Sequence, residues 1–223
     1  MKILPFIVFI SFGIDSAFGQ EIIHLDEKGN KVNETKFRKK WLDSELLLSR
    51  WDSIGKDNKR YATLKKDLYM ITFFAYQEAK EQVEKIINRQ IQENKTILLE
   101  YYYTDDLCTS RWDNNWSKIE ISERKDFTNP IRKKLEKENI IYLVLYERNM
   151  TLHNNPNKKG EYFFIDKNNF FRERIFTNPT MCGSRALIKP NGQTLIRNGE
   201  YRADWMAQHL LPENWNLFFE TKD

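Results

Sequence analysis

The sequence predicts an α/β fold in which helices flank a mixed β-sheet. Three observations carry this prediction. Nearly continuous apolar runs occupy residues 96–103 and 139–146, which is typical of strands covered on both faces. Segments with helical periodicity stand between such runs, so that helices and strands alternate along the chain. An Asn-Gly pair at residues 191–192 separates two short apolar segments, and this is a strong local signal for a β-hairpin.

Length and composition agree with a folded protein. The chain has 223 residues, of which 40% are hydrophobic and 30% are charged. A domain of this size buries roughly 70% of the surface that its unfolded chain exposes. The net charge of +4 is mild and gives no reason to expect a nucleic-acid partner. Two cysteines are too few for a small disulfide-rich scaffold or a multi-cysteine zinc domain.

The first 20 residues have the pattern of a secretory signal peptide. Lys2 provides a positive charge, and residues 3–14 form an apolar stretch that is too short to span a bilayer. Ala17 and Gly19 are small residues at the positions that signal peptidase reads before Gln20. The alternative is an apolar N-terminal strand of the mature protein. We therefore expect an exported protein, periplasmic or extracellular, without membrane insertion after cleavage. The Asn- and Lys-rich composition favours a bacterial source.

Residues 21–72 are expected to form an N-terminal α/β extension. Phe37, Trp41 and Leu48 have helical spacing, although the run at 46–48 suits a strand equally well. The expected elements are a strand at 21–25, a turn at 28–31, a helix at 34–50, a loop at 53–59 and a buried apolar segment at 68–73.

Residues 73–223 contain the alternating pattern. Ala79, Val83 and Ile87 lie on one helical face, and Pro130 is expected in the first turn of its helix, where proline is tolerated. Residues 109–125 fit no single element. The expected elements are helices at 74–94, 127–138, 168–176 and 203–211, with Pro212 ending the last, and strands at 96–103, 139–146, 161–166, 185–189 and 194–197.

This order of elements resembles the thioredoxin fold. The best local match runs from Gly183 to Gly192. It is similar to the segment in which exported thioredoxin-like proteins have a proline, then a short apolar strand and then Asp-Pro-Asp-Gly. Residues 97–103 occupy the place of the strand that leads into the redox motif of that family, and Cys108 lies just beyond it. The resemblance implies a thioredoxin-like domain after the extension.

Two positions depart from the pattern of that family. Its redox motif is Cys-x-x-Cys, whereas this chain reads Cys108-Thr109-Ser110-Arg111. Its cis-proline corresponds to Gly183, which has no proline ring. Both departures count against ordinary dithiol exchange.

The resemblance also implies that Cys108 and Cys182 are neighbours, because the loops that carry them meet at the carboxyl edge of the sheet. Three arrangements are open. A structural disulfide would close a loop of about 75 residues and stabilise the fold by roughly 4.5 kcal/mol in the chain-entropy model. A redox-active pair would use Cys108 as nucleophile and Cys182 as resolving thiol. The two thiols would otherwise be separate and unrelated.

Charged residues near Cys108 would shift the pKa of its thiol in opposite directions. Arg111 would lower the pKa of Cys108, whereas Asp105 and Asp106 disfavour a thiolate. The two aspartates are also a candidate cation or acid–base pair. A polar loop that caps the following turn is the simpler interpretation.

We expect no metal and no cofactor. The three histidines, His24, His153 and His209, lie in different elements, and no zinc-ligand spacing is present. The sequence contains no phosphate-binding loop, dinucleotide fingerprint or nucleophile elbow.

Two functional hypotheses follow from the sequence. The leading one is a non-catalytic envelope or secreted protein whose thioredoxin-like scaffold is closed by a Cys108–Cys182 disulfide. The alternative is a thiol–disulfide oxidoreductase that uses the same two cysteines. An unidentified protein partner is compatible with both hypotheses, and aromatic residues near Trp112 and Trp116 are candidates for its contact surface.

Overall fold

The computed structural model describes residues 21–108 and 114–219 of the chain. The predicted signal peptide, Arg111 and Trp112 lie outside the described residues. None of the helices within the described ranges is long and apolar enough to cross a membrane.

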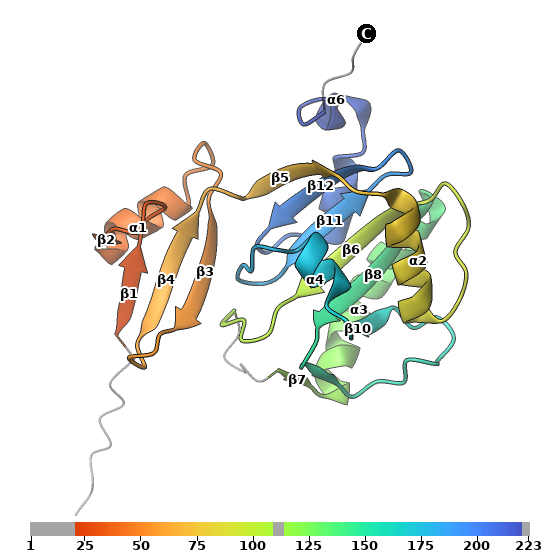
Figure 1. The fold of residues 1–223 in the computed structure, drawn as a ribbon, viewed down its shortest axis with the longest axis horizontal. Coiled ribbons are helices and arrows are strands. Elements are labelled where there is room, and N and C mark those ends of the chain that lie inside the picture. The colour runs from red at the N-terminus through yellow and green to blue at the C-terminus, as the bar shows by residue number, and fades with distance from the viewer. Residues whose placement is uncertain (1–20, 109–113, 220–223) are drawn as a thin grey trace, which may run out of the picture.

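Residues 22–65 form a small α/β layer, which we call the N-terminal unit. Its sheet has four strands in the order β2-β1-β4-β3, and α1 packs on one face (Figure 1). The buried side chains between helix and sheet are those of Phe37, Leu48, Ala62 and Leu64. Its elements are β1 (Ile22–Leu25), β2 (Lys31–Val32), α1 (Glu34–Trp41), β3 (Ser49–Ile54) and β4 (Arg60–Lys65).

The predicted helix at 34–50 is wrong beyond Trp41. Asn33 caps the start of α1 by accepting the N–H of Lys36 at 2.8 Å. After Trp41, the carboxylate of Asp43 accepts the N–H of Glu45, and this local turn competes with further helical hydrogen bonds. Leu47 then adopts a positive φ of 48°, and the chain enters β3.

The larger sheet has six strands in the order β10-β8-β6-β11-β12-β5. Strands β6, β8 and β10 are parallel, whereas β11 is antiparallel to β6 and forms a hairpin with β12. This mixed sheet, with helices on both faces, confirms the predicted fold class. Its strands are β5 (Tyr69–Phe73), β6 (Thr96–Tyr102), β8 (Ile140–Glu147), β10 (Phe163–Asp166), β11 (Ser184–Ile188) and β12 (Gln193–Asn198).

Helices cover both faces of this sheet. Glu100 faces Arg124 of α3, while its neighbour Tyr101 faces Asp166 and Phe176 on the other side. Helix α5 packs beside α3, and α2 and α4 lie on the Tyr101 side (Figure 1). The helices are α2 (Tyr76–Ile87), α3 (Lys118–Lys137), α4 (Phe170–Arg174), α5 (Ala203–Gln208) and α6 (Pro212–Trp215), and a small pairing joins β7 (Asn115–Trp116) to β9 (Thr151–Leu152).

The segment at 68–73 is an edge strand of the larger sheet. We expected it to be buried, but Ile71 is 54% exposed and Phe73 is 73% exposed, because β5 has a strand neighbour, β12, on one side. The domain boundary expected after residue 72 therefore falls inside β5. The chain passes from the sheet of the N-terminal unit to the larger sheet between Lys65 and Tyr69. Separate folding of the two parts stays a prediction.

Three helix boundaries differ from the expected ones. Helix α2 ends at Ile87 because Asn88 takes a left-handed conformation. Helix α5 ends at Gln208 and not at Leu211, so Pro212 does not end it but begins α6. Helix α3 begins at Lys118, so Pro130 lies in its interior and not in its first turn. The start of α3 is a capping box, in which Ser117 accepts the N–H of Glu120 and the Glu120 carboxylate accepts the N–H of Ser117.

The capping box yields a test of this fold. Ser117→Ala removes the side chain that satisfies an N–H group at the first turn of α3, so the free energy of unfolding should fall by about 1 kcal/mol. Ser122→Ala, on the exposed side of the same helix, is the matched control and should change it little. Urea unfolding measures both, and equal effects of the two variants would contradict the assigned helix start.

Candidate functional site

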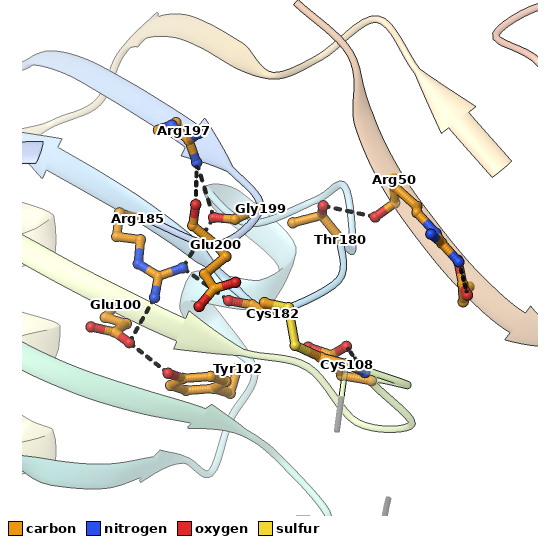
Figure 2. Close-up of a disulfide and its surroundings, with 12 residues drawn as sticks. Arg50, Glu100, Tyr102, Cys108, Thr180, Cys182, Arg185, Arg197, Gly199 and Glu200 are labelled. Carbon is orange, nitrogen blue, oxygen red and sulfur yellow. Dashed lines mark hydrogen bonds and ion pairs between the residues drawn. A yellow bond between two sulfur atoms is a disulfide. The ribbon is translucent and has the colours of Figure 1, made fainter. Parts of the chain in front are cut away.

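Cys108 and Cys182 form a disulfide (Figure 2). Their Cα atoms are 5.1 Å apart although 74 positions separate them in sequence. Cys108 lies six residues after the end of β6, and Cys182 lies two residues before the start of β11. The predicted bridge is confirmed, and the arrangement with two separate thiols is wrong. Both cysteines are half-buried, so the bridge lies at the surface of the fold.

The two cysteines meet because their strands are neighbours that run in opposite directions. Ser184 at the start of β11 pairs with Tyr101 near the end of β6. The chain that leaves β6 therefore passes the chain that enters β11, at the carboxyl edge of the parallel strands. The positions of the cysteines thus follow from the register of these two strands.

Gly183 stands where the resemblance to thioredoxins places a cis-proline. No peptide bond within the described residues is cis, and Cys182 and Gly183 both have positive φ angles, of 64° and 75°. A Cβ atom on Gly183 would lie 2.5 Å from the backbone oxygen of Tyr101. Glycine is therefore required at position 183, because the two strands approach each other closely there. Cys182 adopts a left-handed conformation, which costs a non-glycine residue about 1 kcal/mol.

Asp106 stands two residues before Cys108 and contacts the bridge segment. Its carboxylate accepts the N–H of Cys108 at 3.0 Å. Burial raises the pKa of Asp106 to about 6, against the opposing effect of the N–H groups of Cys108, Cys182 and Gly183, and Asp52 of the N-terminal unit adds to the increase. The carboxylate of Asp106 thus interacts with the backbone N–H groups of both cysteines.

Asp105 does not share this environment. It is exposed, its N–H donates to the side-chain oxygen of Asn114 at 2.8 Å, and its carboxylate accepts the side-chain amide of Asn114 at 3.0 Å. The two aspartates therefore have separate partners. No cluster of three metal-ligating side chains occurs within residues 21–108 and 114–219.

Behind the disulfide lies a buried ionic cluster that the sequence reasoning missed. Glu100 on β6 and Arg185 on β11 are each 1% exposed, and Arg185 Nη2 donates to Glu100 Oε1 at 2.9 Å. Glu100 also accepts hydrogen bonds from Arg124 at 2.5 Å, Tyr102 at 2.6 Å and Tyr142. Burial favours the neutral acid, but the two guanidinium groups outweigh it and lower the pKa of Glu100 to about 2.

Arg185 connects this cluster to the disulfide. Its Nη1 donates to the carbonyl oxygens of Cys182 at 2.9 Å and Gly199 at 3.1 Å (Figure 2). The backbone of Cys182 is therefore fixed from inside the core as well as by its sulfur. Opposite charges within two apolar strand segments, at Glu100 and Arg185, were the available sequence signal.

The N-terminal unit fixes the same loop from outside. The carbonyl oxygen of Arg50 on β3 accepts the N–H of Met181 at 2.8 Å and the hydroxyl of Thr180 at 3.0 Å (Figure 2). Lys65 on β4 donates to the carbonyl oxygen of Pro179 at 2.9 Å. The segment before Cys182 is thus held between two sheets.

The histidines and tryptophans named from the sequence lie elsewhere. His24 packs against Phe37, His153 contacts the side-chain oxygen of Asn115, and His209 packs against Tyr69. Trp116 is half-buried against Tyr102 and Tyr146, so its ring contributes to the core.

Comparisons with known proteins return distant structural neighbours. No family model and no curated protein matches the chain. The pneumococcal exposed lipoprotein thioredoxin Etrx1 from Streptococcus pneumoniae is 14% identical, with 73% of this chain and 98% of that chain covered and a TM-score of 0.34. DsbF from Mycobacterium tuberculosis is 11% identical, with 52% and 78% covered and a TM-score of 0.32. A secreted M. tuberculosis disulfide oxidoreductase homologous to E. coli DsbE is 8% identical, with 55% and 89% covered and a TM-score of 0.31.

The thioredoxin-like class of the fold follows from the chain's own sheet. Parallel β6 and β8 lie beside the antiparallel hairpin of β11 and β12, with helices on both faces, as the resemblance implies. The disulfide joins the loop after β6 to the loop before that hairpin.

Asp106 predicts a specific dependence of stability on pH. Because the folded-state pKa of about 6 exceeds the ordinary aspartate value of 3.8, the group favours folding below pH 3.8, and this contribution is lost as the pH rises through 6. Asp106→Asn should therefore be more stable than the wild type by about 1–2 kcal/mol at pH 7.5, with little difference at pH 4. Denaturant titrations at both pH values measure this.

Asp105→Asn is the control for that variant, because it removes the same charge from the exposed neighbouring position. It should show no such pH-dependent gain. An identical gain in both variants would mean that general charge reduction, and not burial of Asp106, is responsible.

Proposed function

We propose that this protein is an exported, non-catalytic thioredoxin-like protein in which the Cys108–Cys182 disulfide is a structural cross-link. The observation that carries the proposal is the position of Asp106. Its carboxylate accepts the N–H of Cys108, and above pH 6 it is a negative charge beside the bridge. Cleavage of the bridge would place a thiolate against that charge, which favours the closed disulfide and disfavours exchange.

Export is supported by two independent features. The first 20 residues have the composition of a signal peptide. A cross-link between cysteines is stable in an oxidising compartment and rare in a reducing cytosol. A periplasmic or extracellular location suits both features.

The cross-link has a mechanical role in this proposal. It closes a loop of about 75 residues, for which the chain-entropy model gives roughly 4.5 kcal/mol. It also sets the path of residues 179–182, the segment that Arg50 and Lys65 of the N-terminal unit contact. We infer that the disulfide keeps the N-terminal unit docked on the larger sheet.

Thiol–disulfide exchange is the second candidate function. It is favoured by the half-exposed position of the bridge, because exchange requires a sulfur that a partner thiol can reach. In the oxidising direction, the Cys108 thiolate would attack a partner disulfide and expel one partner thiolate. The Cys182 thiolate would then attack the Cys108 sulfur, release the second partner thiolate and leave the Cys108–Cys182 bridge.

Cys182→Ser distinguishes the two candidates. For a structural cross-link, the free energy of unfolding should fall by roughly 4 kcal/mol, because the unfolded chain regains its loop entropy. Hydrogen exchange should also rise at residues 50 and 181, where the N-terminal unit meets the Cys182 segment. Denaturant unfolding and amide exchange measure these effects.

The double variant Cys108→Ser/Cys182→Ser is the matched control, since it lacks the same cross-link but has no free thiol. Both variants should lose the same stability. A small loss in Cys182→Ser, together with a mixed disulfide trapped on Cys108, would instead support the exchange catalyst.

A further inference from the structure

Strand β5 has an open outer edge. The carbonyl oxygen of Leu68 and the N–H of Phe74 both bond on the β12 side, so the even-numbered residues between them also face β12. The N–H and C=O groups of Tyr69, Ile71 and Phe73 therefore point away from β12. Among the described residues, no further strand lies on that side (Figure 1). The edge thus presents a row of backbone donors and acceptors.

This edge lacks the features that usually protect an edge strand. The segment Tyr69–Phe73 contains no charged residue and no proline, and the side chains of Ile71 and Phe73 are exposed. The opposite edge strand, β10, is mostly buried, and the side-chain amide of Asn154 donates to the carbonyl oxygen of Phe163 at 3.0 Å. The larger sheet therefore has one covered edge and one open edge.

An exposed apolar loop lies beside the start of β5. The carbonyl oxygen of Leu47 accepts the N–H of Leu68 at 3.2 Å, and both Leu46 and Leu47 are exposed. Leu47 also has a positive φ of 48°, a conformation that favours glycine or asparagine. An exposed leucine in a strained conformation adds little to the core, and such strain is typical of a residue with a binding role.

An open hollow of about 590 Å³ lies at the other end of β5. Phe73, Phe74, Tyr76 and Pro190 contribute to its lining, which is largely apolar. The strand therefore has an apolar projection at its start and an apolar hollow at its end. A two-fold axis across the strand would bring each projection to a hollow.

We propose that two copies of this chain associate through their β5 strands, antiparallel and about a two-fold axis at Ile71. Ile71 is then opposite Ile71 of the second copy, and Tyr69 is opposite Phe73 of the second copy. These are the residues whose backbone groups point outward, so each pair forms the reciprocal hydrogen bonds of an antiparallel ladder. The two six-stranded sheets become continuous.

The same register brings the projection to the hollow. Leu68 falls opposite Phe74 of the second copy, and Leu68 is the residue that contacts Leu47. Leu47 of each copy therefore reaches the hollow that Phe74 lines in the other copy. The apolar contact thus occurs twice, once on each side of the two-fold axis.

The flanking charges and the second edge are compatible with a closed pair. Asp67 and Lys66 fall opposite Ala75 and Tyr76 of the second copy, so no like charges meet in this register. Pairing consumes the open edge of both copies, and the covered edge at β10 remains outside. The assembly therefore stops at two copies.

Sedimentation velocity of the purified protein over a range of concentrations tests the association. We expect a dimer with a dissociation constant below about 10 μM. A monomer at about 100 μM would overturn the proposal and leave the edge to an extended segment of a different protein. Assemblies larger than a dimer would contradict the closed pair.

Charge substitutions at the axis test the register. Ile71→Lys and Ile71→Glu should each weaken dimerisation at least about tenfold, because like charges would lie opposite each other. An equimolar mixture of these two variants should recover the dimer. Thr72→Lys is the matched control, since its lysine falls opposite Met70 of the second copy, and it should weaken dimerisation less than about threefold. Equal losses in Ile71→Lys and Thr72→Lys, or no recovery in the mixture, would overturn the proposal.

Amide hydrogen exchange verifies that the variants keep β5 folded. In Ile71→Lys, the amides of Met70 and Thr72 should stay protected because they bond to β12, whereas those at 69, 71 and 73 should exchange quickly. In the wild-type dimer all five should be protected. Fast exchange at 69, 71 and 73 in that dimer would contradict pairing through β5.

Discussion

The buried pair of Glu100 and Arg185 is the interaction on which the arrangement of the larger sheet and its disulfide depends. The two residues are direct cross-strand partners of β6 and β11. Burying two charges is expensive, and such a pair adds little to stability relative to well-packed apolar residues. The pair of Glu100 and Arg185 instead fixes the register of β6 against β11. A slip of one residue between the strands would turn one of the two charges to the opposite face and break this buried pair, at a cost of several kcal/mol.

Register then decides where the cysteines lie. With Glu100 opposite Arg185, Tyr101 is opposite Ser184, and the chain after β6 meets the chain before β11. Arg185 also binds the carbonyl oxygen of Cys182, so the charge that sets the register holds one end of the bridge. The N-terminal unit contacts the same segment through Arg50. A buried ion pair, a disulfide and a docked α/β layer therefore converge on one loop.

The sequence predicted those features that depend on local patterns. The apolar strands at 96–103 and 139–146 and the hairpin around Gly192 were visible in residue type and spacing, and they form β6, β8, β11 and β12. The thioredoxin resemblance placed Cys108 beside Cys182. The start of α3 was not predicted, although Ser117 and Glu120 have the spacing of a capping box.

The remaining features depend on partners that are distant in sequence. The exposure of Ile71 and Phe73 follows from the edge position of β5, and strand order is not encoded in five residues. A charged side chain such as Glu100 or Arg185 is unfavourable in an apolar strand when that strand is considered alone. The charge becomes acceptable because the neighbouring strand supplies its partner. For the same reason, the sequence did not show that Asp106 would be half-buried near the N-terminal unit.

The reduction potential of the Cys108–Cys182 disulfide tests most directly whether this bridge is a structural cross-link. The purified protein would be equilibrated in thiol–disulfide buffers, alkylated and analysed by intact mass. A midpoint below about −300 mV is predicted, because a structural bridge resists reduction by cellular thiols. A midpoint of roughly −120 to −270 mV would place the pair among exchange catalysts and contradict the account.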